Sequence, residues 1–180
     1  MHSERALPRW LTTLAAAASA LWIGPGAATE AAVPEHHMKA AFVYNFAVFT
    51  QWPAETLAGG GPLSVCASAD TALYAALKQL TDKPINGHPV ALRGTAGSLH
   101  DCHVLVLERG DRERWPQWKR AVAGSPVLTV ADDRVIGDDG AIIALSNDNQ
   151  RISFDIDMAA VRGARLALSS KLLRLARSVQ

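Results

Sequence analysis

The chain has 180 residues, 49% of them hydrophobic, and its 18 basic and 17 acidic residues nearly cancel. This length predicts one domain with a hydrophobic core of its own. The charge balance excludes a typical nucleic-acid binder, because contacts with phosphates need clustered lysine and arginine.

Residues 1–28 have the pattern of a secretory signal peptide. Arg5 and Arg9 precede an apolar run at residues 10–23, and small residues follow around Pro25. That order of a charged start, an apolar middle and a small-residue end is typical of export signals, and the run is shorter than the ~20 residues of a membrane-spanning helix. We expect cleavage near Ala28, which leaves a formally neutral mature chain. An uncleaved anchor is the alternative.

Two cysteines, Cys66 and Cys102, remain in the mature chain. An even pair in an exported protein predicts a disulfide, because the compartment outside the cytoplasm is oxidising. Two separately buried thiols are the alternative, since the sequence alone does not show that the two residues approach each other.

The first element of the mature chain is a helix. After a lead at residues 29–37, which we expect to be mobile, the domain is predicted to span residues 38–180. The stretch at residues 37–53 is almost entirely apolar. It predicts a helix of about 14 residues that ends at Trp52-Pro53, because proline disfavours helical geometry in the residue before it.

The following elements alternate between short apolar strands and amphipathic helices. The predicted strands lie at residues 62–68, 89–94, 102–107 and 126–132, and the predicted helices lie at residues 70–80, with Asp70 as N-cap, and 111–122, with the regular part after Trp115. An antiparallel hairpin is predicted at residues 141–146 and 151–157. A short strand and a helix capped by Ser169 or Ser170 complete the chain at residues 165–179. This alternation predicts a three-layer α/β/α sandwich with a mostly parallel sheet, an added hairpin and a Rossmann-like topology.

No catalytic or cofactor-binding motif stands out in the sequence. It contains no G-x-S-x-G elbow, and Gly59-Gly60-Gly61 lacks the Gly-Lys-Ser/Thr of a phosphate-binding loop. No G-x-G-x-x-G follows a predicted strand. We therefore predict no catalytic residues, no cofactor and no enzyme.

Three groups of residues are candidate metal ligands. In the His100–His103 stretch, Cys102 and His103 are strand neighbours that point to opposite faces, so they converge poorly on one ion. His36 and His37 fall in the lead. Four carboxylates, Asp132, Asp133, Asp138 and Asp139, could hold calcium, but their spacing is not that of an EF-hand loop. A solvated acidic turn and no metal site are expected.

The first helix is apolar on nearly every face. Phe42, Phe46 and Phe49 form one stripe, while Tyr44, Val48 and Trp52 lie on other faces. Such a helix is usually buried on more than one side. It is either a central helix between the sheet and the C-terminal helix, or one on which Tyr44, Val48 and Trp52 contact a partner or a second protomer. Both interpretations can hold together.

Lys171, Arg174 and Arg177 recur every third residue near the C-terminus. They predict a basic stripe on the last helix, opposite the leucines at 172, 173 and 175. Positive charge is favourable near a helix C-terminus, so a solvated face is one interpretation. A contact with an acidic partner or with lipid head groups is the other.

Several segments together resemble the YfiR/HmsC-like family of exported bacterial proteins. The most specific are K-A-A-F-x-Y-N-F-A-x-F-x-x-W-P at residues 39–53 and S-S-K-L-L-R-L-A at residues 169–176. Between them lie "LSVCASAD", "CHVLVL", "PVLTVAD" and "RISFDID" in the family's order. The similarity covers the chain from about Met38 to Val179.

The resemblance implies a periplasmic regulator without catalytic activity. Family members hold an inner-membrane diguanylate cyclase inactive by binding its periplasmic part, which lowers cyclic di-GMP and restrains biofilm formation. The resemblance also implies a bond between Cys66 and Cys102. This sequence departs from the family pattern in three places. Gly137 and Gly140 are separated where relatives often carry a Gly-Gly pair and a Phe, and Asp155-Ile156-Asp157 stands where Glu-Ile-Asn is usual. The second cysteine pair that some relatives carry is absent from this sequence.

From these observations we predict binding to the periplasmic part of an inner-membrane signalling protein, through Tyr44, Val48, Trp52, Lys171 and Arg174. A homodimer is a further option, and no stable membrane insertion is expected. The alternative function is a periplasmic small-ligand sensor or carrier that acts with a sensor kinase or an outer-membrane transporter, since an α/β sheet offers a crevice at its strand ends.

Overall fold

The computed structural model describes residues 33–149 and 151–180. The predicted signal peptide, its cleavage site and the start of the predicted lead therefore lie outside the described residues. Within the described part, a seven-stranded sheet has the spatial order β3-β2-β4-β5-β6-β7-β9. Its strands are β2 (Leu63–Ala67), β3 (Val90–Gly94), β4 (Val104–Glu108), β5 (Leu128–Asp132), β6 (Ile143–Asp148), β7 (Arg151–Ile156) and β9 (Ser178–Val179).

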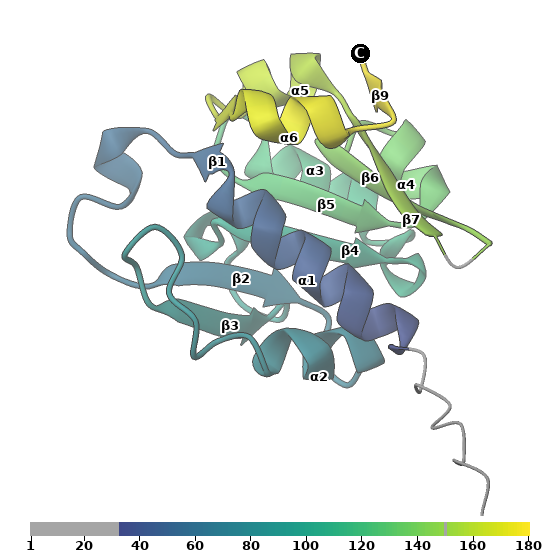
Figure 1. Ribbon diagram of the computed structural model, residues 1–180. Coiled ribbons are helices and arrows are strands. Elements are labelled where there is room, and N and C mark those ends of the chain that lie inside the picture. Colours follow the sequence, from purple (N-terminus) through teal and green to yellow (C-terminus); the bar gives the residue numbers. More distant parts are fainter. Residues whose placement is uncertain (1–32, 150) are drawn as a thin grey trace, which may run out of the picture. The chain divides into compact units, whose positions relative to one another are not determined.

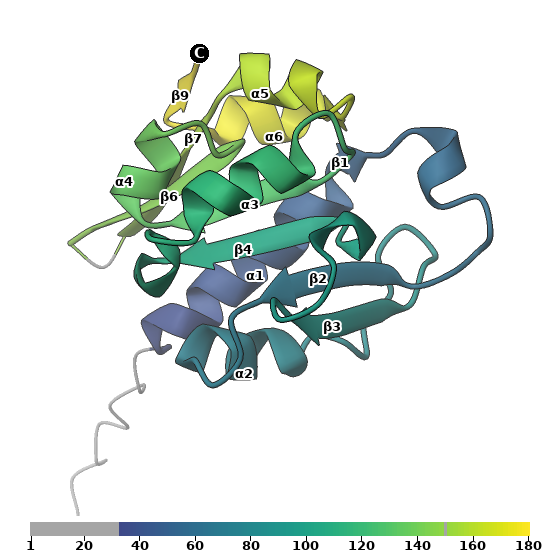
Figure 2. The same cartoon turned by 180° about the vertical axis from the view of Figure 1, so that it is seen from behind.

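Helices cover both faces of this sheet (Figures 1 and 2). One core cluster combines side chains of the sheet with α1 (Glu35–Val48), α2 (Ala72–Lys78), α5 (Met158–Gly163) and α6 (Ser170–Leu175). The other combines the opposite face with α3 (Trp115–Val122) and α4 (Arg134–Asp138). The predicted three-layer α/β/α sandwich is confirmed. Short 3-10 turns η1 (Ala54–Thr56), η2 (Leu99–Asp101) and η3 (Arg109–Asp111) lie in the connections.

The topology is doubly wound. Strands β3, β2, β4, β5 and β6 are parallel neighbours, which is the flavodoxin-like order of this class. The chain reverses its direction of winding between β2 and β4. β6 and β7 form the predicted antiparallel hairpin, in which Leu145 faces Phe154. β9 pairs in parallel with β7, but only at Asp155 and Ile156.

α1 differs from its predicted bounds at both ends. It begins at Glu35, so residues 35–37 are helical and the prediction of a mobile lead through residue 37 was wrong. It ends at Val48, ahead of Trp52-Pro53. Thr50 and Gln51 instead form β1, antiparallel to β8 (Ala167–Leu168).

One local and one tertiary hydrogen bond accompany this early end. The Thr50 hydroxyl donates to the Phe46 carbonyl at 2.7 Å, and the Ser169 N–H donates to the Phe49 carbonyl at 2.9 Å. These donors satisfy carbonyls that a helix end leaves without intrahelical partners. The proline is therefore not what stops the helix.

Two other local predictions, the N-cap of the helix at residues 70–80 and the acidic turn, were wrong. The N-cap of α2 is Thr71, whose hydroxyl accepts from the Tyr74 N–H at 3.0 Å, while Asp70 has a φ of 64°. The stretch predicted as a solvated acidic turn contains α4, whose N-cap is Asp133. Its carboxylate accepts from the Ile136 N–H at 3.2 Å.

The C-terminal prediction holds in part. β8 is the predicted short strand, and Ser169 caps α6 by accepting from the Leu172 N–H at 3.4 Å. However, α6 ends at Leu175. The Arg177 N–H donates to the Phe154 carbonyl at 2.8 Å, which brings β9 alongside β7. Arg177 therefore does not extend a helical stripe.

Candidate functional site

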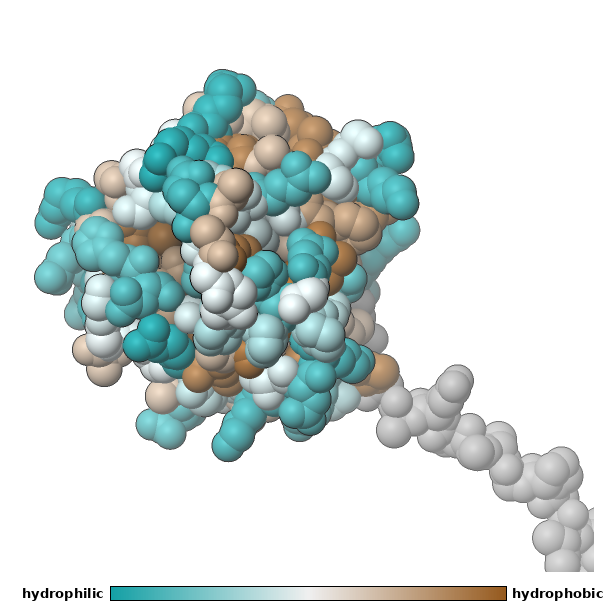
Figure 3. All heavy atoms as spheres, turned by 90° about the vertical axis from the view of Figure 1, so that its left-hand side faces the viewer, coloured by the Kyte–Doolittle hydropathy of each residue, from teal (hydrophilic) through white to brown (hydrophobic). Residues whose placement is uncertain are grey.

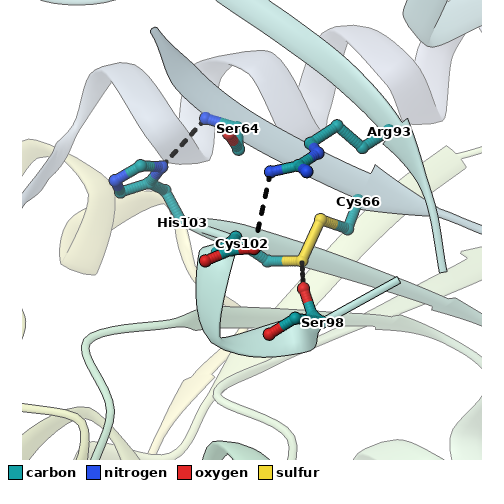
Figure 4. The surroundings of a disulfide bond; sticks show 7 residues. Ser64, Cys66, Arg93, Ser98, Cys102 and His103 are labelled. Atoms are coloured by element: carbon teal, nitrogen blue, oxygen red, sulfur yellow. Dashed lines mark hydrogen bonds and ion pairs between the residues drawn. A yellow bond between two sulfur atoms is a disulfide. The ribbon is translucent and has the colours of Figure 1, made fainter. Parts of the chain in front are cut away.

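The two cysteines form a disulfide, as predicted. Cys66 of β2 and Cys102, directly after η2, are joined across 36 residues with 5.8 Å between their Cα atoms, and both are buried. Figure 4 shows the surrounding contacts. The Ser64 N–H donates to Nδ1 of His103 at 2.9 Å, and Arg93 lies 3.9 Å from Asp101. The disulfide therefore ties β2, the neighbour of the edge strand β3, to the loop that precedes β4.

His103 of the weighed HDCH stretch is part of this structural network. Burial lowers the pKa of its imidazole, and its ring lies edge-on to Trp52 with 6.4 Å between centroids. His100 is exposed. Among the described residues, no three histidine, cysteine or acidic side chains are grouped so that they could hold a metal ion.

The predicted partner residues of α1 lie against the chain itself. Tyr44 is half-buried and its hydroxyl donates to the Pro84 carbonyl at 3.0 Å. The Val48 carbonyl accepts from the Asn86 side chain at 3.2 Å, and Val48 and Trp52 pack against the core. These contacts give the three residues structural roles; a role in partner binding stays a prediction.

Figure 3 shows the side of the domain on which η1 lies. Hydrophilic and neutral side chains cover most of this face. The hydrophobic residues appear as small separate patches between them. A broad apolar surface is not a feature of this side.

The flank of α1 that faces α6 borders an open apolar groove. The groove has a volume of about 570 Å³ and is lined by residues of α1, the start of β7 and α6. These three elements are labelled in Figure 1. We call this cavity the α1–α6 groove. Its lining is Met38, Ala41, Phe42, Asn45, Phe46, Phe49, Arg151, Ile152, Phe154, Leu172 and Leu175.

Local sequence explains this lining. In α1 the residues at 38, 42, 45, 46 and 49 recur at three- and four-residue spacing, so they share one face of the helix. In β7, Ile152 and Phe154 alternate onto the face toward α1. Phe154 is buried against Phe46, with ring centroids 4.8 Å apart, and forms the floor. Leu175 stands on the rim with 68% of its surface exposed.

The predicted basic stripe is divided between two environments. Lys171 and Arg174 of α6 are exposed. Arg177, beyond the helix, pairs with Asp155 of β7 and lies 3.3 Å from Asp148. Neither Lys171 nor Arg174 pairs with a carboxylate of residues 33–149 or 151–180, whereas Arg177 fastens β9 to the hairpin.

A second concavity, which we call the strand-end crevice, lies outside the carboxyl ends of β2 and β4. It has a volume of about 390 Å³ and is lined by polar groups. Asp111, 1% exposed, accepts from the Ser68 hydroxyl at 2.7 Å, the Glu108 N–H at 2.8 Å and Arg114 at 2.8 Å. This is the topological switch point, where open α/β sheets commonly bind ligands.

An ion pair closes one side of the strand-end crevice. Lys39 of α1 donates to Asp132 at 2.8 Å and also pairs with Glu35. Burial raises the pKa of Asp132, against the opposing effect of Lys39, and it also raises the pKa of Glu108. For Lys39, burial acts to lower the pKa, but the hydrogen bonds and charges of Asp132 and Glu35 outweigh it and raise the net value. The sequence predicted a crevice at the strand ends but not its residues, because these come from separate segments at residues 68–71, 108–114 and 132, with Lys39 beside them.

The four aspartates weighed for calcium all meet cations of the chain instead. Lys39 pairs with Asp132, Arg112 donates to both oxygens of Asp133 at 2.8 and 2.6 Å, and Asp138 and Asp139 lie 3.5 and 3.3 Å from Arg134 and Lys119. The bidentate bond with Arg112 lowers the pKa of Asp133. Asp132 thus ties α1 to the end of β5, Asp133 ties the turn before α3 to the start of α4, and Asp139 ties α3 to the end of α4.

Comparison with known proteins decides the family. The YfiR/HmsC-like family model matches residues 36–177, which is most of the chain. The chain belongs to the YfiR/HmsC-like family. This is a family of periplasmic regulatory proteins rather than of enzymes. The comparison with curated proteins yields no match.

The fold also has a counterpart among solved structures. The crystal structure of a conserved domain protein from Vibrio cholerae O1 biovar El Tor strain N16961 superimposes with a TM-score of 0.52 at 10% identity. The alignment covers 81% of this chain and 60% of that one, so the YfiR/HmsC-like chain spans about three fifths of that protein's length. At this identity the likeness shows the fold alone. Within the described residues, no helix is long and apolar enough to cross a membrane.

Proposed function

We propose that this YfiR/HmsC-like protein is a periplasmic, non-enzymatic regulator that binds and represses an inner-membrane diguanylate cyclase. Repression lowers cyclic di-GMP and restrains biofilm formation. The observation that carries the proposal is the family match over residues 36–177. The signal-peptide pattern of residues 1–28 supports export, and the α1–α6 groove supplies an apolar surface of the kind that marks interaction sites.

Repression by binding has a thermodynamic requirement. The protein shifts its target only by its differential affinity for the inactive over the active state. A preference of about 3 kcal/mol changes the ratio of the two states by roughly 150-fold. A folded domain with a disulfide and no moving catalytic part is sufficient for this task.

Deletion of the gene tests the proposal, with cyclic di-GMP and surface attachment as the measurements. We expect both to rise in the deletion strain and to return when the full chain is restored. A chain without residues 1–28 is the matched control, because it is expected to stay in the cytoplasm and to fail to restore repression. Unchanged cyclic di-GMP after deletion would refute the proposal.

The strand-end crevice favours a second candidate, a periplasmic small-ligand sensor or carrier that acts with a sensor kinase or an outer-membrane transporter. It lies at the switch point, and one buried oxygen of Glu108, Oε2, has no hydrogen-bond partner within the described part. Native mass spectrometry of protein purified from the periplasm separates the two. A stoichiometric small molecule that is lost in a Glu108→Ala variant supports the sensor.

A further inference from the structure

The α1–α6 groove lies beside a strand edge that is only half paired. β9 covers β7 at Asp155 and Ile156 and ends there. The Phe154 and Ile156 carbonyls accept from Arg177 and Gln180 on that side, at 2.8 and 2.9 Å. In an antiparallel ladder, alternate residues direct their backbone groups to the same side. The N–H and the carbonyl of Ile152 therefore point to the β9 side as well.

Within residues 33–149 and 151–180, no chain segment pairs with Ile152 on that side. An exposed strand edge is a template for an added strand. In this mode of recognition, backbone hydrogen bonds give affinity and pockets for alternate side chains give specificity. Here the pocket exists: Ile152 belongs to the open edge and, together with Phe154, lines the groove.

The other edge of the sheet does not offer this combination. β3 is also an edge strand, but the cavity between its apolar face, α1 and α2 has a volume of only about 20 Å³. A peptide that paired with β3 would find no pocket for its side chains. Of the edges of this sheet in the described part of the chain, only that of β7 combines the two features.

The charges around the α1–α6 groove indicate what kind of molecule it binds. Arg151 is the one charged residue among its described lining. Lys171 and Arg174 are exposed on the neighbouring helix, and no described carboxylate lies within ion-pair distance of any of the three. Leu175, 68% exposed, extends the apolar surface out of the groove. An apolar surface that continues past the cavity fits a polypeptide better than an enclosed small molecule.

We propose that the α1–α6 groove and the free edge of β7 bind an extended acidic segment of a partner protein. The segment adds a short strand at Ile152, places an apolar side chain over Phe42 and Phe154, and sets its carboxylates against Arg151, Lys171 and Arg174. This deepens the proposed function, on which it rests for the occupant being a protein.

Photo-crosslinking in living cells tests this inference independently of cyclic di-GMP. The full chain carries Leu175→p-benzoylphenylalanine at the groove rim or, as the matched control, Val135→p-benzoylphenylalanine. Val135 is 56% exposed on α4, which packs on the other face of the sheet. The crosslinked peptide is identified by mass spectrometry. We expect an acidic segment of one envelope protein from position 175 and not from position 135.

Backbone pairing is tested by comparing Ile152→Pro with Ile152→Ala in the same crosslinking strain. Both remove the side chain, but only proline removes the outward N–H, and proline is tolerated on an edge strand. We expect the proline variant to give a crosslink yield about tenfold lower than the alanine variant, in line with a lost backbone hydrogen bond. Arg151→Glu is expected to lower the yield similarly. The disulfide and the protein level in the periplasm verify folding.

Each contrary outcome overturns the inference. These outcomes are no adduct at position 175, an adduct with a basic segment, an adduct with a second copy of this chain, a bound lipid or fatty acid in place of a peptide, and equal yields from the proline and alanine variants. If the acidic adduct forms while gene deletion leaves cyclic di-GMP unchanged, the docking site stands and the proposed cyclase target fails. If deletion raises cyclic di-GMP and no adduct forms, the proposed function stands and the docking site is refuted.

Discussion

The two flanks of α1 are packed very differently. On the flank toward α2, Val43, Tyr44 and Ala47 meet the β2–β3 edge, and the apolar space left is about 20 Å³. On the flank toward α6, Phe42 and Phe49 border a groove of about 570 Å³. One apolar helix thus contributes to a closed core on one side and leaves an open surface on the other.

The difference follows from which neighbours each flank receives. α2 is seven residues long and runs beside α1, and the disulfide fixes the strand below it. On the other flank α6 has only six residues, and β9 pairs with two residues of β7. An apolar face left without a neighbouring element is more often a binding surface than a defect in packing.

The largest effect is expected at the floor of the α1–α6 groove. Phe154→Ala removes a buried ring that packs on Phe46, so the free energy of unfolding should fall by about 3–5 kcal/mol. Urea unfolding of the purified domain measures it. A loss below about 1 kcal/mol would mean that the groove floor is not part of the core. It would contradict the description of the two flanks of α1 given above.

Loss of the disulfide, which fixes β2 on the closed flank, should lower the free energy of unfolding almost as much. Replacing Cys66 and Cys102 together by alanine opens a loop of 36 residues, and the chain-entropy relation gives a loss of about 3–4 kcal/mol. Unfolding curves of the variant and of the oxidised protein provide the measurement. Wild type under reducing conditions should match the variant. Equal stability of the three would show that the closed flank does not need the bond.

A smaller effect is expected at Asp133, which caps α4 and binds Arg112. Asp133→Ala should cost about 1 kcal/mol at neutral pH through the lost cap. Because the pKa of Asp133 is lowered in the folded protein, its contribution is present above the ordinary value of 3.8 and is lost as the pH falls through the folded value. The stability gap between variant and wild type should therefore close in acid. Asp138→Ala, at an exposed pair, is the control with little effect at either pH.

The smallest effect is expected at Tyr44. Tyr44→Phe removes the hydrogen bond to the Pro84 carbonyl and should cost at most about 1 kcal/mol, with repression of cyclic di-GMP unchanged. Thermal unfolding and a cellular cyclic di-GMP assay measure the two quantities. Normal stability with lost repression would instead place the partner surface on the closed flank, as the sequence predicted for this residue.

Much of the fold could be predicted because its signals are local. The apolar strands at β2, β4 and β5, the alternation of Ile152, Phe154 and Ile156, and the cap at Ser169 are each readable over a few residues. The C-terminal end of α1 could not be read in this way, because the N–H that donates to the Phe49 carbonyl belongs to Ser169, 120 residues beyond Phe49. The short helix α4 is capped locally by Asp133, which accepts from the Ile136 N–H, but its acidic, glycine-containing sequence is equally typical of a turn.

The sequence by itself determined the class of fold, the family and the pairing partner available to each cysteine, since these follow from periodicity, motif order and residue count. It also identified Phe42, Phe46 and Phe49 as one stripe. Only the tertiary structure decided which apolar side chains are covered, because burial depends on the neighbour that packs there and not on the hydrophobicity of the residue. That is why Tyr44 and Trp52 lie against the chain while Phe42 and Phe49 border open space.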